Sequence, residues 1–217
     1  MRKYFIFCII LLIGLSQTAL AHTINYALEN APVQDVSWYY FALGFKHIIP
    51  EGIDHVLFIT GICLINKTLK PIIWQASAFT VAHTIALALS MKNIIAAPPA
   101  IVEPIIAASI VFVAVENLVL QKMKPWRLLL IFLFGLVHGM GFASSLNEIG
   151  LPRDTFYTSI LSFNIGVEVC QILIICLVYF LIIKPFGSQL WYRKGIVYPV
   201  SVMIALISSY WVFERIV

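Results

Sequence analysis

Charged residues are scarce in this chain of 217 residues: 11% are Asp, Glu, Lys or Arg, whereas 61% are hydrophobic. A soluble domain carries about a quarter charged residues, so the composition excludes an ordinary soluble protein. The apolar runs are longer than the alternating strands of a membrane barrel, which favours helices. We therefore predict an all-α, polytopic membrane helix bundle. The net charge of +4 is small and is accounted for by loop residues, so no nucleic-acid partner is expected.

Several motifs with defined chemistry are also missing. The four cysteines (Cys8, Cys63, Cys170 and Cys176) share no useful spacing, which excludes a C-x-x-C site and a disulfide framework. The chain contains neither H-E-x-x-H nor G-x-S-x-G, so no catalytic residue is assigned. The sequence leaves open whether the protein is an enzyme.

The first 21 residues have the pattern of a secretory signal peptide. Arg2 and Lys3 precede the apolar run "YFIFCIILLIGL", and "ALA" at residues 19–21 has the small-x-small form of a cleavage site. An uncleaved first membrane helix is the alternative. We expect residues 22–50 to form an exported segment whose amphipathic part, "YYFALGFKHII", lies at the membrane surface. Residues 51–217 are then the transmembrane domain.

Six membrane spans are expected in that domain, at about residues 51–66, 71–90, 100–119, 128–147, 157–183 and 195–213. The first is close to the lower limit for a span. Alternate loops hold most of the basic residues: Lys67, Lys70, Lys122, Lys124, Arg127, Lys184, Arg193 and Lys194. The opposite loops hold only Lys92 and Arg153, with Arg215 at the tail. The positive-inside rule places the basic loops in the cytoplasm and both mature termini outside.

Polar residues in five spans are expected between the outer surface and the midplane of the membrane. Ionisable groups at such positions are costly and usually face a cavity or one another. Imidazoles and carboxylates are ligands of divalent transition metals. The candidate metal site comprises His55, His83, His138, Asp54, Glu103 and Glu168, with His47 and Asn164 as possible accessory residues. Asp54 could either bind the ion or orient the His55 ring.

A structural alternative exists for each of these residues. A buried histidine can be a hydrogen-bonded packing residue, and Glu103 could be favoured by the dipole at its helix start. Small residues next to His138, namely Gly135, Gly139 and Gly141, could allow close helix packing or leave room for a ligand. The joint pattern in one half of the membrane favours the metal site.

Five segments carry a resemblance to a known family. "GFKHIIPEGIDHVLFITGICLI", "WQASAFTVAHTIALAL", "IVEPIIAASIVFVAVENL", "PWRLLLIFLFGLVHGMGFASSL" and "FNIGVEVCQ" resemble the HupE/UreJ family of bacterial membrane proteins, in its second branch. The resemblance covers about residues 40–180. It implies a protein of the bacterial cytoplasmic (inner) membrane that transports nickel or delivers it to a maturing metalloenzyme. The metal itself is left open among nickel, cobalt and zinc.

Three functions therefore remain open. The first is a permease or delivery protein for a divalent transition metal, with a His/Asp/Glu site open to the outer face. The second is an intramembrane zinc-dependent hydrolase or transferase, in which a three-histidine site would activate water. The third is a non-catalytic accessory protein that assembles with an exported partner through its N-terminal segment.

Overall fold

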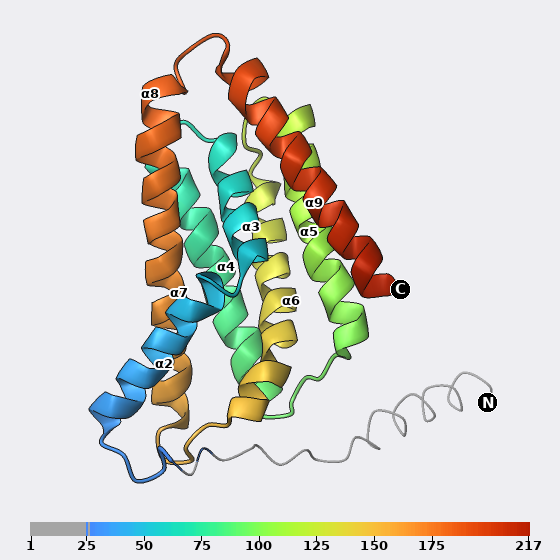
Figure 1. Cartoon of the computed structure of the whole chain (residues 1–217). Helices are drawn as coiled ribbons and strands as arrows, with labels where there is room; N and C mark the ends of the chain where they lie inside the picture. The colour runs from blue at the N-terminus through green and yellow to red at the C-terminus, as the bar shows by residue number, and fades with distance from the viewer. Residues whose placement is uncertain (1–24, 26) are drawn as a thin grey trace, which may run out of the picture.

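The computed structural model of this chain describes residue 25 and residues 27–217. The predicted signal peptide lies outside these residues, and the division at residue 50 stays a prediction. Every regular element in the described part is helical, which confirms the predicted fold class (Figure 1). The α-helices are α2 Val33–Ile48, α3 Ile53–Leu64, α4 Leu69–Met91, α5 Pro99–Val119, α6 Trp126–Ile149, α7 Phe156–Val178, α8 Lys184–Phe186 and α9 Tyr198–Ile216.

Five continuous helical stretches in the described part are long and apolar enough to cross a membrane. They correspond to the second to sixth expected spans. The fifth expected span continues from α7 through a π-helical segment into α8, and the sixth begins with a π-helical segment before α9. Each π-helical segment ends two residues before a proline, Pro185 or Pro199. A proline ring clashes with the carbonyl four residues earlier, which accounts for the wider turn there.

The first expected span, residues 51–66, is wrong as a single membrane-crossing helix. Helix α3 has only 12 residues. At 1.5 Å per residue it extends about 18 Å, whereas the hydrocarbon core is about 30 Å thick. Helices α2 and α3 meet the criteria for a span only together, and they are bent by 70° at the break between them. The missing length is thus supplied by α2, which the sequence analysis had assigned to a surface helix.

Glycines set how closely the helices approach one another. A Cβ atom on Gly139 of α6 would collide with the backbone carbonyl of His83 on α4, and one on Gly135 would lie 2.5 Å from the carbonyl oxygen of Phe79. Gly166 of α7 meets the backbone of α2 at Phe41 in the same way. Gly135 and Gly139 therefore allow close packing of α4 and α6. They do not leave room for a ligand, which was the alternative that the sequence left open.

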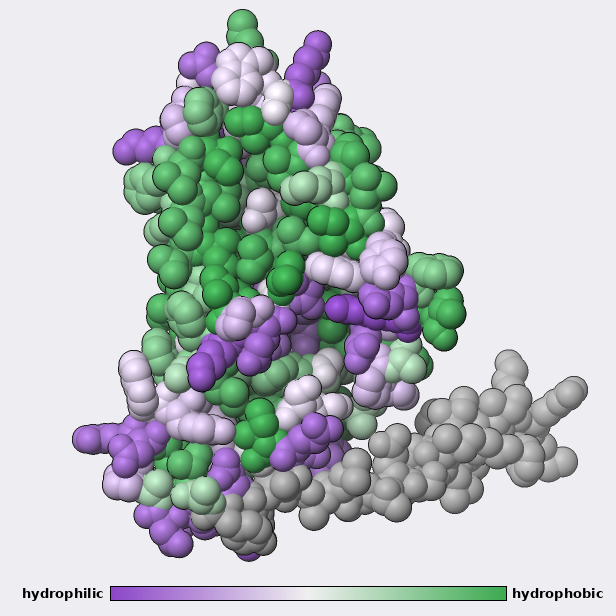
Figure 2. All heavy atoms as spheres, viewed as in Figure 1, coloured by the Kyte–Doolittle hydropathy of each residue, from purple (hydrophilic) through white to green (hydrophobic). Residues whose placement is uncertain are grey.

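The surface of the molecule suits a membrane. Figure 2 shows a broad band of hydrophobic side chains below the α8 end of the bundle, with hydrophilic side chains at that end and again further down. Large apolar side chains such as Leu129, Leu181 and Leu206 are more than half exposed. Such exposure would be costly in water and is expected where side chains face lipid.

A buried polar network lies at the α8 end and includes Arg127, which the sequence pattern had placed in a basic loop. Arg127 is only 1% exposed, and its Nε atom lies 3.2 Å from a carboxylate oxygen of Glu116. The Arg127 guanidinium also donates to the side-chain oxygen of Asn117. Asn117 in turn donates to the carbonyl of Gly61 at 2.7 Å, so the network reaches the last turn of α3. Arg127 is thus a structural residue and not a free loop charge.

We predict that Gly139→Leu destabilises the bundle, because the new side chain must push α4 and α6 apart. Overpacking of this kind costs about 1–3 kcal/mol. The measurement is the thermal unfolding midpoint of the purified protein in detergent. Leu133→Ala, at a position on the same helix that is 44% exposed, is the control and should change the midpoint little. An unchanged midpoint for Gly139→Leu would contradict the packing role of this glycine.

Candidate metal centre

Four histidines from four helices lie side by side inside the bundle. His47 is near the end of α2, His55 near the start of α3, His83 in α4 and His138 at the middle of α6. The ring centroids are 4.8 Å apart for His47 and His55, 5.1 Å for His55 and His138, and 6.1 Å for His47 and His83. The structure thus brings together the three predicted ligands and the predicted accessory histidine.

The bend between α2 and α3 is what joins His47 to His55. The chain turns between Ile49 and Gly52, and the amide of Gly52 donates to the carbonyl of Ile48 at 3.2 Å. A Cβ atom on Gly52 would collide with the carbonyl oxygen of His47, so the chain passes very close to itself here. A larger residue at position 52 would therefore force the two histidines apart.

Three of the imidazole rings are held in the same way. The Nδ1 atom of each lies 3.0 Å from an oxygen acceptor: a carboxylate oxygen of Asp54 for His55, the amide oxygen of Asn164 for His83, and the carbonyl of Phe134 for His138. The orientation of the Asn164 amide is set by its nitrogen, which donates to the carbonyl of Ile160 at 2.8 Å. An acceptor opposite Nδ1 requires a proton there, so the neutral imidazole carries its lone pair on Nε2.

The Nε2 atoms of all four histidines are buried and have no hydrogen-bond partner within the described chain. A buried polar atom without a partner costs roughly 1–3 kcal/mol, and four together call for an explanation. Phe79, itself buried, packs against three of the rings, with its centroid 4.8 Å from that of His138, 5.9 Å from His55 and 6.1 Å from His83. Its phenyl ring offers these nitrogens no hydrogen bond.

The donor set fits a transition metal ion. Neutral imidazole nitrogens bind zinc at about 2.0–2.1 Å, which places the ring centres around a tetrahedral ion roughly 5 Å apart. The observed spacings of 4.8 to 6.1 Å are close to that value. No group of three His, Cys, Asp or Glu side chains in residue 25 or residues 27–217 is already arranged to hold an ion. An ion bound by these histidines would require the rings to turn until their Nε2 atoms converge on one point.

A cavity of about 280 Å³ opens beside these rings. Its charged and imidazole lining comes from His47, Asp54, His55, Glu103, His138 and Arg215. His83 does not line this cavity and is fully buried behind it. The cavity gives His55 and His138 a space in which a ligand larger than a bare ion would fit.

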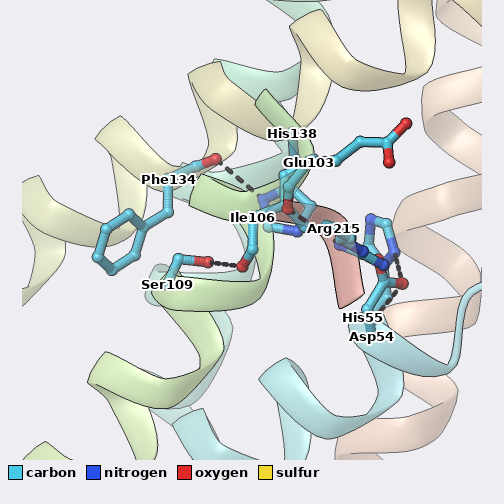
Figure 3. A network of polar contacts seen from close by, with 8 residues as sticks. All are labelled: Asp54, His55, Glu103, Ile106, Ser109, Phe134, His138 and Arg215. Carbon is cyan, nitrogen blue, oxygen red and sulfur yellow. Dashed lines mark hydrogen bonds and ion pairs between the residues drawn. The ribbon is translucent and has the colours of Figure 1, made fainter. Parts of the chain in front are cut away.

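Asp54 connects the histidines to the mouth of the cavity (Figure 3). One of its carboxylate oxygens accepts hydrogen bonds from both the backbone and the ring of His55, at 2.8 and 3.0 Å. The other oxygen lies 3.9 Å from the guanidinium of Arg215. The geometry thus supports the orienting role considered for Asp54, and one oxygen remains directed at the cavity.

The two glutamates are placed differently from the histidines. Glu103 is exposed at the rim of the cavity, and Figure 3 shows its carboxylate pointing away from His138 and Asp54. Its backbone carbonyl accepts from Arg215 at 3.1 Å. Glu168 lies one helical turn beyond Asn164 on α7 and accepts a hydrogen bond of 2.7 Å from Ser77 on α4. The structure does not bring Glu168 to the cavity.

Arg215 lines the cavity, although its sequence position did not predict this. It was treated as a charge on the tail, yet α9 packs along α5 and brings its last turn to the cavity. The only signal in the sequence was the charged pair Glu214–Arg215 directly after an apolar span. A helix end alone does not predict which other helix it meets.

We predict that His83→Ala and His138→Ala each reduce metal binding strongly, because each substitution removes one nitrogen ligand. The measurement is isothermal titration of the purified protein with nickel, cobalt and zinc salts. Gln75→Ala is the control, because Gln75 is a buried polar residue on α4, the helix of His83, and its side chain donates to the carbonyl of Pro71 without being a candidate ligand. Normal stoichiometry and affinity in both histidine variants would reject the site.

A second prediction concerns Asn164, which orients the candidate ligand His83 and is not expected to bind the ion itself. Asn164→Leu should lower metal affinity by about 10- to 100-fold, the usual effect of removing the partner that orients a metal-binding histidine. Asn164→Asp should retain most of the affinity, because a carboxylate also accepts from the His83 ring. The same titration compares the two variants. Equal loss in both would show that residue 164 acts through packing and not through its acceptor oxygen.

The comparisons with known proteins identify a family. Residues 22–215 match the family model described as HupE / UreJ protein. No curated protein and no solved structure gives a significant match. The matched region covers the described helices up to the last residue of α9 and includes all four clustered histidines. The chain therefore belongs to the HupE/UreJ family of membrane proteins.

Proposed function

We propose that this protein is a permease, or a delivery protein, for a divalent transition-metal ion of the nickel or cobalt type. The observation that carries the proposal is the set of four buried histidine Nε2 atoms that find no hydrogen-bond partner among residue 25 and residues 27–217. Imidazole nitrogen suits nickel, cobalt and zinc better than it suits magnesium or calcium. The family membership supports the same class of cargo.

The charge of the ligand set favours reversible binding. Four neutral imidazoles leave the two positive charges of the ion uncompensated, and Asp54 already shares its oxygens between His55 and Arg215. The guanidinium of Arg215 also repels a cation that approaches Asp54 through the cavity. A site of this kind would hold an ion less firmly than a cysteine-rich structural zinc site, and a transport protein must release its cargo.

Polar side chains continue beyond the histidines along α7. Asn164, Glu168 and Gln171 are spaced at i, i+4 and i+7, which places them on one face of the helix. Ser77 of α4 meets this face at Glu168, and a nitrogen of Gln171 is buried without a partner. We propose that this row supplies hydrogen-bonding positions for an ion that leaves the histidines towards the α8 end.

The orientation in the membrane belongs to the same proposal. The loops with most of the basic residues all lie at the α8 end of the bundle (Figure 1). The positive-inside rule then puts this end in the cytoplasm and the α2 segment outside, in the inner membrane of a bacterium. Metal would enter at the cavity and move from the outside towards the cytoplasm.

An intramembrane hydrolase is the second candidate function. The cavity beside His55 and His138 favours it, because three imidazoles on zinc and an open position could activate a water molecule. Asp54 is the carboxylate at hand to accept a proton. In this reading the ion would be a resident cofactor held by the histidines and not a cargo. The third candidate function is an accessory role. In that role α2 and the segment before it would contact an exported or metalloenzyme-maturation partner.

Uptake into proteoliposomes tests the proposed function. The purified full-length chain should carry nickel or cobalt into vesicles loaded with a metal-sensitive dye, whereas a His55→Ala/His138→Ala variant should not. Protein-free vesicles and a Lys92→Gln variant, altered in the connection between α4 and α5 at a residue that does not line the cavity, are the controls. Absence of uptake together with one tightly held zinc per chain would reject the permease and favour the hydrolase.

A further inference from the structure

A second and larger cavity lies at the α8 end, far along the bundle from the histidines. Its volume is about 560 Å³. Three separate connections line it: residues 64–68 between α3 and α4, residues 121–123 between α5 and α6, and residues 187–193 after α8. Figure 1 shows these connections together at the same end of the molecule. The metal-transport proposal assigns no function to this cavity.

The lining of this cavity is positively charged. Lys67, Lys122 and Arg193 each come from a different connection, and none of the lining residues is Asp or Glu. Within the described chain, no carboxylate lies within ion-pair distance of these three side chains. Arg193 donates only to neutral oxygens, which are the carbonyls of Asn117 and Leu118 and the hydroxyl of Tyr198. Lys67 and Lys122 therefore bring two positive charges without a carboxylate partner to one cavity, whereas the Arg193 guanidinium beside them is held by carbonyls at the end of α5.

The start of α4 adds partial positive charge to the same cavity. Thr68, the N-cap residue of α4, lines the cavity, and no side-chain hydrogen bond caps the helix there. The first backbone N–H groups of a helix carry partial positive charge and bind anions readily. Ser188, Gln121 and Gln189 add further hydrogen-bond donors to the lining. A divalent cation would be repelled from such a cavity, so it is unsuitable as a metal site.

We propose that this cavity binds a phosphate group, and that the group belongs to the headgroup of an anionic phospholipid. Basic pockets between membrane helices on the cytoplasmic side suit lipid phosphates. Leu190, in the lining, is fully exposed, and its neighbour Trp191 is half exposed, as expected of side chains that insert among lipids. A free phosphate offers the same charge but no acyl chains for these two side chains.

Ordinary loop charge explains the presence of basic residues at this end but not their arrangement. Lys70 lies in the first turn of α4 and Lys194 in the π-helical segment before α9, directly after two of these connections, yet neither lines the cavity. These two lysines provide a matched comparison for Lys67 and Lys122. The positive-inside rule treats all four alike, whereas a phosphate site distinguishes the pair in the cavity from the pair outside it.

Native mass spectrometry of the full-length protein in mild detergent tests the proposal. The wild type should retain phosphatidylglycerol in preference to phosphatidylcholine. Lys67→Gln/Lys122→Gln should weaken phosphatidylglycerol binding by about 10-fold or more, because each lysine contributes appreciably to attraction of an anionic headgroup. Lys70→Gln/Lys194→Gln, with the same loss of two charges, should bind nearly as the wild type does.

Three outcomes would decide against the site or its occupant. Equal weakening in both double variants would show a general effect of charge and overturn the site. Equal retention of phosphatidylglycerol and phosphatidylcholine by the wild type would overturn it as well. Displacement of the lipid by millimolar inorganic phosphate would keep the phosphate site but reject the lipid as its occupant. Circular dichroism and nickel titration of each variant check folding, and Lys122→Gln alone replaces the double variant if that variant fails to fold.

Discussion

The candidate metal centre depends on one repeated interaction, the pairing of an imidazole Nδ1 atom with a fixed oxygen acceptor. The acceptors differ in kind: a carboxylate for His55, an amide for His83 and a backbone carbonyl for His138. Each of them settles the tautomer and the orientation of one ring, so the Nε2 lone pair is left for a ligand. Without these acceptors the rings could rotate and satisfy their nitrogens elsewhere, and the cluster would be only a group of packed histidines.

This interaction in turn requires helices that approach one another very closely. The contact between Gly139 and the carbonyl of His83 lets α6 lie against α4 at the level of the site. His138 is the neighbour of Gly139 in sequence and so lies near His83. The contact of Gly166 with the backbone of α2 fixes α7 against the helix that carries His47. A glycine thus stands next to a candidate ligand because the glycine sets the short distance between two helices. The histidines reach one another only at that distance.

The sequence was sufficient for the helical class and for five of the spans. It also named the four histidines that the fold brings together, whereas their role as metal ligands stays a prediction. Long apolar runs are read reliably because lipid requires every backbone group to be satisfied within the segment. The break between α2 and α3 could not be predicted, because a 12-residue helix and a short span have the same apolar pattern. Glu168 and Arg215 show the limit for side chains: spacing within a helix gives the face, whereas the partner on another helix depends on packing. Arg127 was misread for the same reason, since a basic residue beside a loop can point inwards to Glu116.

Helix α3 is the element through which the two ends of the bundle are connected. Its first turn carries Asp54 and His55, and its last turn is held by Asn117 at the carbonyl of Gly61 and by Tyr192 at the carbonyl of Leu64, at 2.7 and 3.1 Å. A helix of three turns is too short to be positioned by lipid contacts alone, so these bonds determine how far His55 reaches towards the other histidines. Tyr192 and Leu64 also line the cavity at the α8 end. The cavity at the α8 end and His55 thus lie at opposite ends of the same short helix, about 14 Å apart along its axis at 1.5 Å per residue.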